Sequence, residues 1–71
     1  MRVDTDDYVG LTGRRPRGKE YGCWVFEILS QNGQSQGHIT SKHYGYSNAA
    51  AEAKLLACAR VGRKGKVVLC P

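Results

Sequence analysis

The sequence predicts a small α+β fold: a three-stranded antiparallel sheet packed against one helix in the C-terminal half, with a short final strand. Three observations predict it: an alternating apolar run at residues 23–30, an Asn-Gly turn directly after it, and an alanine-rich stretch at residues 49–60. A chain of 71 residues is long enough for one domain and too short for two. We therefore expect residues 1–71 to form one domain, in the order strand, strand, strand, helix, strand.

The N-terminal part of the chain gives the weakest pattern. Residues 1–7 are acidic and short, which predicts a frayed, flexible tail. Tyr8 to Leu11 are expected to form the first strand. Residues 12–19 contain glycine, proline and four cations, so we expect an irregular basic turn there.

The clearest strand is Cys23 to Ser30. Trp24, Phe26 and Ile28 recur with a period of two, which places these large side chains on one face of a pleated strand. We expect that face to form the core, with Glu27 on the opposite face in water.

The segment Gln31-Asn32-Gly33-Gln34 predicts a hairpin turn. Asn-Gly favours a type I′ turn because both residues tolerate a positive φ. Residues 36–46 are then expected to form either one strand with a bulge or two short strands.

Residues 49–60 are expected to form the helix, capped by Ser47 or Asn48 and terminated by Gly62. Two apolar stripes are possible on it. One stripe comprises Ala51, Leu55, Cys58 and Ala59, and the other comprises Ala50, Ala53, Ala57 and Val61. We expect the stripe with leucine to face the core, with Leu56 at its edge. A basic turn at residues 63–66 and a short strand at residues 67–70 complete the fold.

The charge is strongly unbalanced: eleven Lys and Arg oppose six Asp and Glu, a net charge of +5. Eight of the eleven cations lie in two short segments, Arg14, Arg15, Arg17 and Lys19 in one, and Arg60, Arg63, Lys64 and Lys66 in the other. Each phosphate that a cation neutralises releases counterions, so clustered cations favour nucleic acid as a partner. An acidic protein surface is the other partner that such clusters fit. Tyr21, Tyr44 and Tyr46 could stack on bases if exposed, although we expect at least one of them in the core.

Three cysteines, Cys23, Cys58 and Cys70, are an odd number for a disulfide scaffold, which predicts buried thiols in a reducing cytoplasm. No apolar run approaches the ~18 residues that a membrane span needs, so no membrane partner is expected. His38 and His43 are the only pair with ligand-like spacing, whereas structural zinc sites normally include a close cysteine pair. We expect no metal, no cofactor and no enzyme activity, with a spatial pairing of Cys58 and His43 left open.

Three short motifs resemble a known family. The family's opening motif is matched at Tyr8, Gly10 and Leu11, and its R-P-x-G-K stretch at residues 15–19. Trp24-Val25-Phe26-Glu27-Ile28 matches the family's W-x-A-E-I stretch in order and spacing. In these motifs the chain resembles the plant-type ethylene-response-factor, or integrase-type, DNA-binding domain. The resemblance implies a three-stranded sheet laid in the DNA major groove, with Arg15, Lys19 and Glu27 facing the DNA. A double-stranded RNA-binding domain is also similar in that its hairpins precede an alanine-rich helix, although residues 47–50 lack its lysines.

We therefore expect a small basic protein that binds nucleic acid, duplex DNA in the first instance, through the sheet face and the flanking basic turns. The expected binding residues are Arg14, Arg15, Arg17, Lys19, Glu27, Arg63, Lys64 and Lys66. The alternative is a phage or mobile-element interaction module that inhibits a host nuclease complex by binding protein. The oligomeric state stays open.

Overall fold

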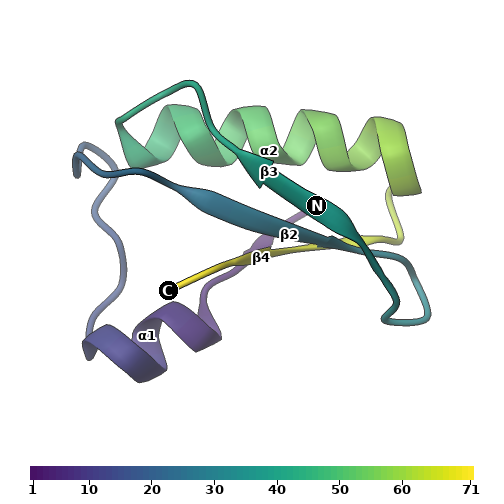
Figure 1. Ribbon diagram of the computed structural model, residues 1–71, viewed down its shortest axis with the longest axis horizontal. Helices are drawn as coiled ribbons and strands as arrows, with labels where there is room; N and C mark the ends of the chain where they lie inside the picture. The colour runs from purple at the N-terminus through teal and green to yellow at the C-terminus, as the bar shows by residue number, and fades with distance from the viewer.

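A computed structural model describes residues 1–71 as a four-stranded sheet with two helices (Figure 1). The elements in chain order are β1 (Val3–Asp4), α1 (Asp6–Thr12), β2 (Val25–Leu29), β3 (Ser35–Thr40), α2 (Tyr46–Val61) and β4 (Lys66–Leu69). The strands lie in the order β1-β4-β2-β3; β2 pairs antiparallel with β3 and with β4, and β1 pairs parallel with β4. The α+β class is confirmed, and the expected short final strand is present as β4. The expected three-stranded antiparallel sheet with one helix is wrong, because β1 and α1 stand in place of the expected first strand and the four-stranded sheet includes the parallel pair of β1 and β4.

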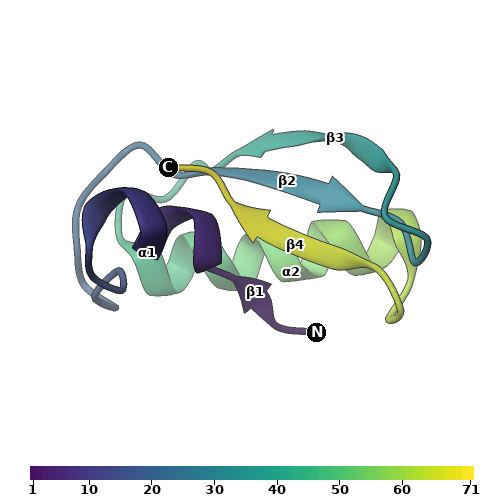
Figure 2. The same cartoon turned by 90° about the horizontal axis from the view of Figure 1, so that it is seen from below.

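The core lies between the sheet and α2, and its residues on β2 are those that the alternation predicted. Phe26 and Ile28 are fully buried and Trp24 is nearly so. The cross-strand partners Val67 and Leu69 of β4 are fully buried on the same face. Glu27 lies on the opposite face, as expected; α2 covers none of this open face, and α1 approaches it only at one end of the sheet (Figure 2).

The face of α2 that packs on the sheet differs from the expected one. Ala49, Ala50, Ala53 and Ala57 are buried, whereas Leu55 is 75% and Leu56 46% exposed. The prediction of a leucine-bearing core stripe is therefore wrong. Short alanine side chains let the helix lie close to the sheet, and the large side chains of β2 and β4 already fill the space between them.

The beginning of α2 also differs. The N-cap is Gly45, and neither Ser47 nor Asn48 caps the helix, because no side chain makes a cap hydrogen bond. Gly62 ends the helix as expected, its N–H donating to the Cys58 carbonyl over 2.9 Å.

Residues Tyr8 to Leu11 form part of α1, so the prediction of a first strand there is wrong. Asp6 and Asp7 lie in the first turn of α1, where negative charge is favourable to the helix dipole. Gly13 ends the helix with φ 80°, and its N–H donates to the Val9 carbonyl over 2.8 Å. Tyr8 is buried, with its ring centroid 5.9 Å from that of Trp24.

The predicted flexible tail at residues 1–7 is also wrong. Val3 pairs with Val67 and Asp4 with Val68, so β1 forms the edge of the sheet beside β4. The Asp4 carboxylate accepts a hydrogen bond from the Asp6 N–H over 2.9 Å and so joins β1 to the first turn of α1.

The hairpin between β2 and β3 is present, but its turn is not type I′. Within the turn only Gly33 has a positive φ, 87°, so Asn32 does not adopt the conformation that type I′ requires. Gly33 N–H donates to the Ser30 carbonyl and Ser30 N–H to the Gln34 carbonyl, the pattern of a three-residue loop with glycine in its last position. The following strand stops at Thr40, and of residues 41–46 only Gly45 pairs, in an isolated bridge with Tyr21.

Candidate nucleic-acid interface

The two basic segments of the sequence meet at one groove. Arg15, from the loop between α1 and β2, and Arg63, from the turn between α2 and β4, line the same hollow of about 710 Å³, together with Arg2 and Lys66. The parallel pairing of β1 with β4 brings Arg2 near Arg63 and Lys66, because it places the N-terminus on the side of the molecule where the turn before β4 lies (Figure 2). Residues far apart in the sequence thus contribute cations to one surface.

The cations of this groove are not equally free to bind a ligand. Lys66 Nζ lies 3.0 Å from the Asp4 carboxylate. The pKa of Asp4 is lowered, first by the hydrogen bond from Asp6 N–H and then by Lys66, so this pair stays charged. Arg2, Arg15 and Arg63 form no ion pair, although the Asp4 and Asp6 carboxylates line the same groove. We assign these three arginines most of the groove's capacity for an anionic ligand.

Arg14 holds the basic loop in place. Its guanidinium donates to both Glu20 carboxylate oxygens, over 2.5 and 3.1 Å, and the Tyr8 hydroxyl donates to the same carboxylate over 3.1 Å. The hydrogen bond from Arg14 is the main reason that the pKa of Glu20 falls to about 2. Glu20 therefore links the loop to α1, and Arg14 is a structural cation in this loop.

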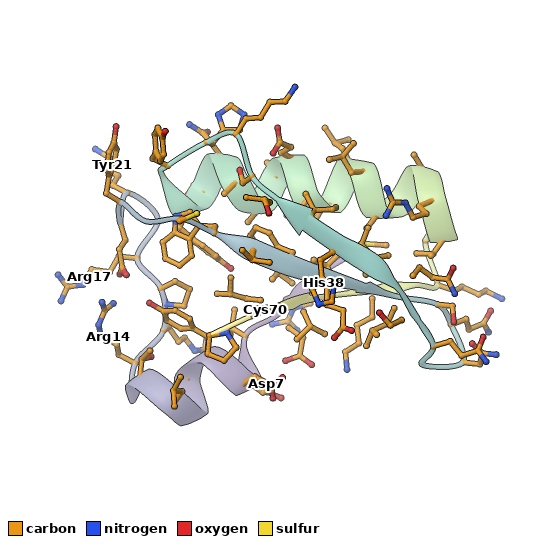
Figure 3. The ribbon with its side chains drawn as sticks, viewed as in Figure 1. Asp7, Arg14, Arg17, Tyr21, His38 and Cys70 are labelled. Carbon is orange, nitrogen blue, oxygen red and sulfur yellow. The ribbon has the colours of Figure 1, made fainter.

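Arg17 and Lys19 of the same loop form no ion pair, and Arg17 projects from the same end of the molecule as Arg14 and Tyr21 (Figure 3). Lys64 lies in the turn beside Arg63, also without an ion pair, but it does not line the groove. Of the residues expected to bind nucleic acid, Arg15, Arg63 and Lys66 come together in one place.

The open face of the sheet differs from the expected DNA-binding face. Glu27 lies there with His38, whose Nε2 is 3.9 Å from its carboxylate, and the Asp4–Lys66 pair lies on the same face. This face has no excess of cations. Arg15 and Lys19, which the family resemblance would place beside Glu27, lie in the loop before β2.

A second hollow, of about 550 Å³, is lined in part by residues further along the same loop. Lys19, Tyr21, His43 and Tyr44 line it, with Ser47 and Asn48 from the start of α2. Tyr21 is 79% and Tyr44 62% exposed, and their ring centroids are 5.5 Å apart. From the sequence, Tyr21, Tyr44 and Tyr46 could each lie in the core or stack on bases. In the structure Tyr46 is partly buried against the core, whereas Tyr21 and Tyr44 lie at the surface.

The thiols and histidines form no evident reactive centre. Cys23 and Cys58 are exposed, so the expectation of buried thiols is wrong for both. Burial raises the pKa of the Cys70 thiol, with further contributions from Glu27 and Asp7, so this thiol stays protonated and weakly nucleophilic near neutral pH (Figure 3). His43 lies 3.7 Å from Glu52, and no three His, Cys, Asp or Glu residues gather in a metal-binding arrangement.

No protein-family model, curated protein or solved structure matches this chain. Neither helix combines the length and the apolar character needed to cross a bilayer.

Proposed function

We propose that the protein binds nucleic acid by contacting phosphates in the groove that Arg2, Arg15 and Arg63 line. The observation that supports this most directly is that Arg15 and Arg63, from different basic segments, line one hollow and have no carboxylate partner. Guanidinium groups bind phosphate oxygens in a two-pronged geometry, and each phosphate contact adds to the affinity through counterion release.

This proposal moves the expected interface from the sheet face to the groove beside β1. Phosphates are common to duplex and single strands, so the groove alone does not select between them. Duplex DNA is the first ligand to test, and a cytoplasmic location, expected from the cysteine count, belongs to the same proposal.

The test is fluorescence anisotropy with a labelled random-sequence duplex at low and moderate salt. We expect a dissociation constant of roughly 10⁻⁴ to 10⁻⁶ M at physiological salt, and much tighter binding at low salt. Arg15→Glu and Arg63→Glu should each weaken binding about tenfold and lower the slope against log salt by about one.

Arg60→Glu is the matched control, since it changes the net charge equally. Arg60 donates to the Gln36 carbonyl on β3, at the edge of the sheet opposite to β1. If Arg60→Glu weakens binding as much as the two groove variants, binding follows net charge and the groove assignment is wrong. If the wild-type protein binds neither the duplex nor a single strand of the same length at low salt, the nucleic-acid proposal itself is wrong.

A protein-binding module is the second candidate function. The outer face of α2 exposes Leu55 and Leu56, and Met1, 39% exposed, lines a hollow together with Leu55. Exposed leucines grouped on one helix face are typical of protein contact surfaces. The alternative of a phage or mobile-element module that inhibits a host nuclease complex would use this face to bind its protein partner.

A further inference from the structure

We infer that Tyr21 and Tyr44 form a stacking platform for unpaired bases, which makes single-stranded nucleic acid the preferred ligand. This inference rests on the proposed function and names the ligand class of the same basic surface. It concerns the second hollow, which Lys19, Tyr21, His43 and Tyr44 line.

The two rings are presented to solvent as a pair. Their centroids lie 5.5 Å apart with an interplanar angle of 32°. The other two tyrosines pack inward: Tyr8 is buried, and the ring of Tyr46 lies 5.0 Å from that of Trp24. The chain therefore leaves half of its tyrosines exposed at one place, and exposed aromatic faces are the groups on which nucleic-acid bases stack.

The platform is fixed to the core through its backbone. The Tyr44 carbonyl accepts two hydrogen bonds, one from Gly22 N–H over 2.9 Å and one from the nearly buried Trp24 Nε1 over 2.7 Å. Tyr21 pairs with Gly45 in a β-bridge. Because both backbone positions are already ordered, a base that stacks there costs little further conformational entropy in the protein.

The surroundings match the other parts of a nucleotide. Lys19 and His43 line the same hollow and can contact a phosphate, while Ser47 and Asn48 make no cap hydrogen bond and offer polar groups to a base edge. Duplex bases keep their faces inside the stack, so only unpaired bases can use the tyrosine rings.

The platform and the arginine groove adjoin along one loop. Arg15 and Pro16 line the groove, and Gly18 and Lys19, only a few residues further on, line the tyrosine hollow. Arg17 lies between them without an ion pair and projects from the end of the molecule that also presents Tyr21 (Figure 3). A single strand can therefore have its phosphates in the groove and its bases on the tyrosines.

The experiment compares three labelled probes at one low salt concentration: oligothymidylate of about 12 nucleotides, an abasic strand of the same length, and the matching duplex. We expect the wild-type protein to bind oligothymidylate about tenfold more tightly than the abasic strand, the ratio that ~1.4 kcal/mol produces. Tyr21→Ala and Tyr44→Ala should remove this preference and leave affinity for the abasic strand unchanged. Tyr21→Phe and Tyr44→Phe should retain it, because phenylalanine keeps the ring face.

Leu11→Ala is the matched control, an exposed apolar side chain on α1, and it should change none of the three affinities. Thermal unfolding of each alanine variant checks that the fold is intact, and both rings are exposed enough that no change is expected. Oligouridylate tests RNA in the same way, and a tyrosine-dependent preference for either strand supports the platform and identifies its ligand.

Two results overturn the inference, and they are distinguishable. If the wild-type protein binds oligothymidylate and the abasic strand equally, or if the alanine variants lose affinity for both, the tyrosines do not stack on bases, although phosphate binding in the groove stands. If the wild-type protein binds none of the probes, the proposed function fails together with the platform.

Discussion

At the scale of single residues, Glu20 connects more of the candidate interface than any cation does. Its carboxylate accepts hydrogen bonds from the Arg14 guanidinium, the Tyr8 hydroxyl and, over 3.4 Å, the Arg17 N–H. Its backbone carbonyl accepts the Tyr46 N–H at the start of α2. One acidic residue thus holds the basic loop against both helices, and its own charge is nearly hidden from a ligand, since its side chain is 19% exposed.

The Glu20 contacts predict a specific dependence of stability on pH. The pKa of Glu20 falls from its usual 4.5 to about 2 in the folded chain, mainly because of Arg14. A carboxylate with a depressed pKa stabilises the fold above its unfolded-state value and loses that contribution as the pH falls through its folded-state value. We therefore expect the melting temperature of the wild-type protein to fall between about pH 4.5 and about 2, in part through this group.

The variant Glu20→Gln isolates this contribution. It should melt at a lower temperature than the wild-type protein at neutral pH, and the difference should shrink as the pH falls from about 4.5 to about 2. Circular dichroism melts across that range provide the measurement. A difference that stays constant with pH would show that the charge of Glu20 does not stabilise the fold.

At the scale of elements, the pattern of the central strand and the end of the long helix could be predicted, but not the start or the packing face of that helix. Period two at Trp24, Phe26 and Ile28 is a local signal, and the structure follows it. In α2 both stripes are apolar, so hydrophobicity favours the stripe with leucine, whereas the close approach to the sheet selects alanine. The distance between the helix and the sheet depends on the volume of side chains on the strands, and the local sequence pattern of the helix gives no information about it.

The short helix α1 shows a different limit. Tyr8 and Val9 favour a strand by propensity, but Asp6, Asp7 and Gly13 provide the start and stop signals of a helix. Those signals were present in the sequence and outweigh the propensity of two residues. The turn type after Ser30 was mispredicted for a related reason, since Asn-Gly also fits a three-residue loop in which only glycine has a positive φ.

The packing face of α2 makes a direct prediction about stability. Ala53 is fully buried, so Ala53→Leu should overpack the interface and reduce the free energy of unfolding by roughly 1–3 kcal/mol. Leu55→Ala should change it by no more than about 0.5 kcal/mol, because the side chain is 75% exposed. Urea unfolding of both variants gives the comparison. A larger loss in Leu55→Ala than in Ala53→Leu would show that the helix packs through the leucine stripe.

At the scale of the whole molecule, the candidate interface depends on contacts that are distant in sequence. The two basic segments were visible from composition alone, and their clustering favoured an anionic partner. Part of the groove follows from the parallel pairing of β1 with β4, which joins residues near the two ends of the chain and brings Arg2 near Arg63 and Lys66. A two-residue strand such as Val3–Asp4 carries no alternating pattern, so the sequence offered no signal for it. The groove was for that reason not predictable, while most of its cations were.

The distribution of charge over the whole molecule makes the last prediction. Of eleven Lys and Arg, only Arg14 and Lys66 form ion pairs with carboxylates. The others lie on a body of 28 × 24 × 17 Å, where they repel one another more than in an unfolded chain. Salt shortens the range of this repulsion to about 10 Å at 0.1 M. The melting temperature should therefore rise by a few degrees when salt is raised from about 0.01 to about 0.15 M, since ~1 kcal/mol shifts it by roughly 4–8 °C in a chain of this size.

The groove arginines should account for part of that rise. A double variant, Arg15→Gln with Arg63→Gln, removes two cations from the groove, so its melting temperature should be higher at low salt and should increase less as salt is added. Melts at neutral pH, where Glu20 and Asp4 are ionised, keep both ion pairs constant across the series. A melting temperature that falls with added salt would instead mean that the Arg14–Glu20 and Lys66–Asp4 attractions outweigh the repulsion. Repulsion between the unpaired arginines would then not destabilise the fold, and an anionic ligand would not stabilise the protein by neutralising it.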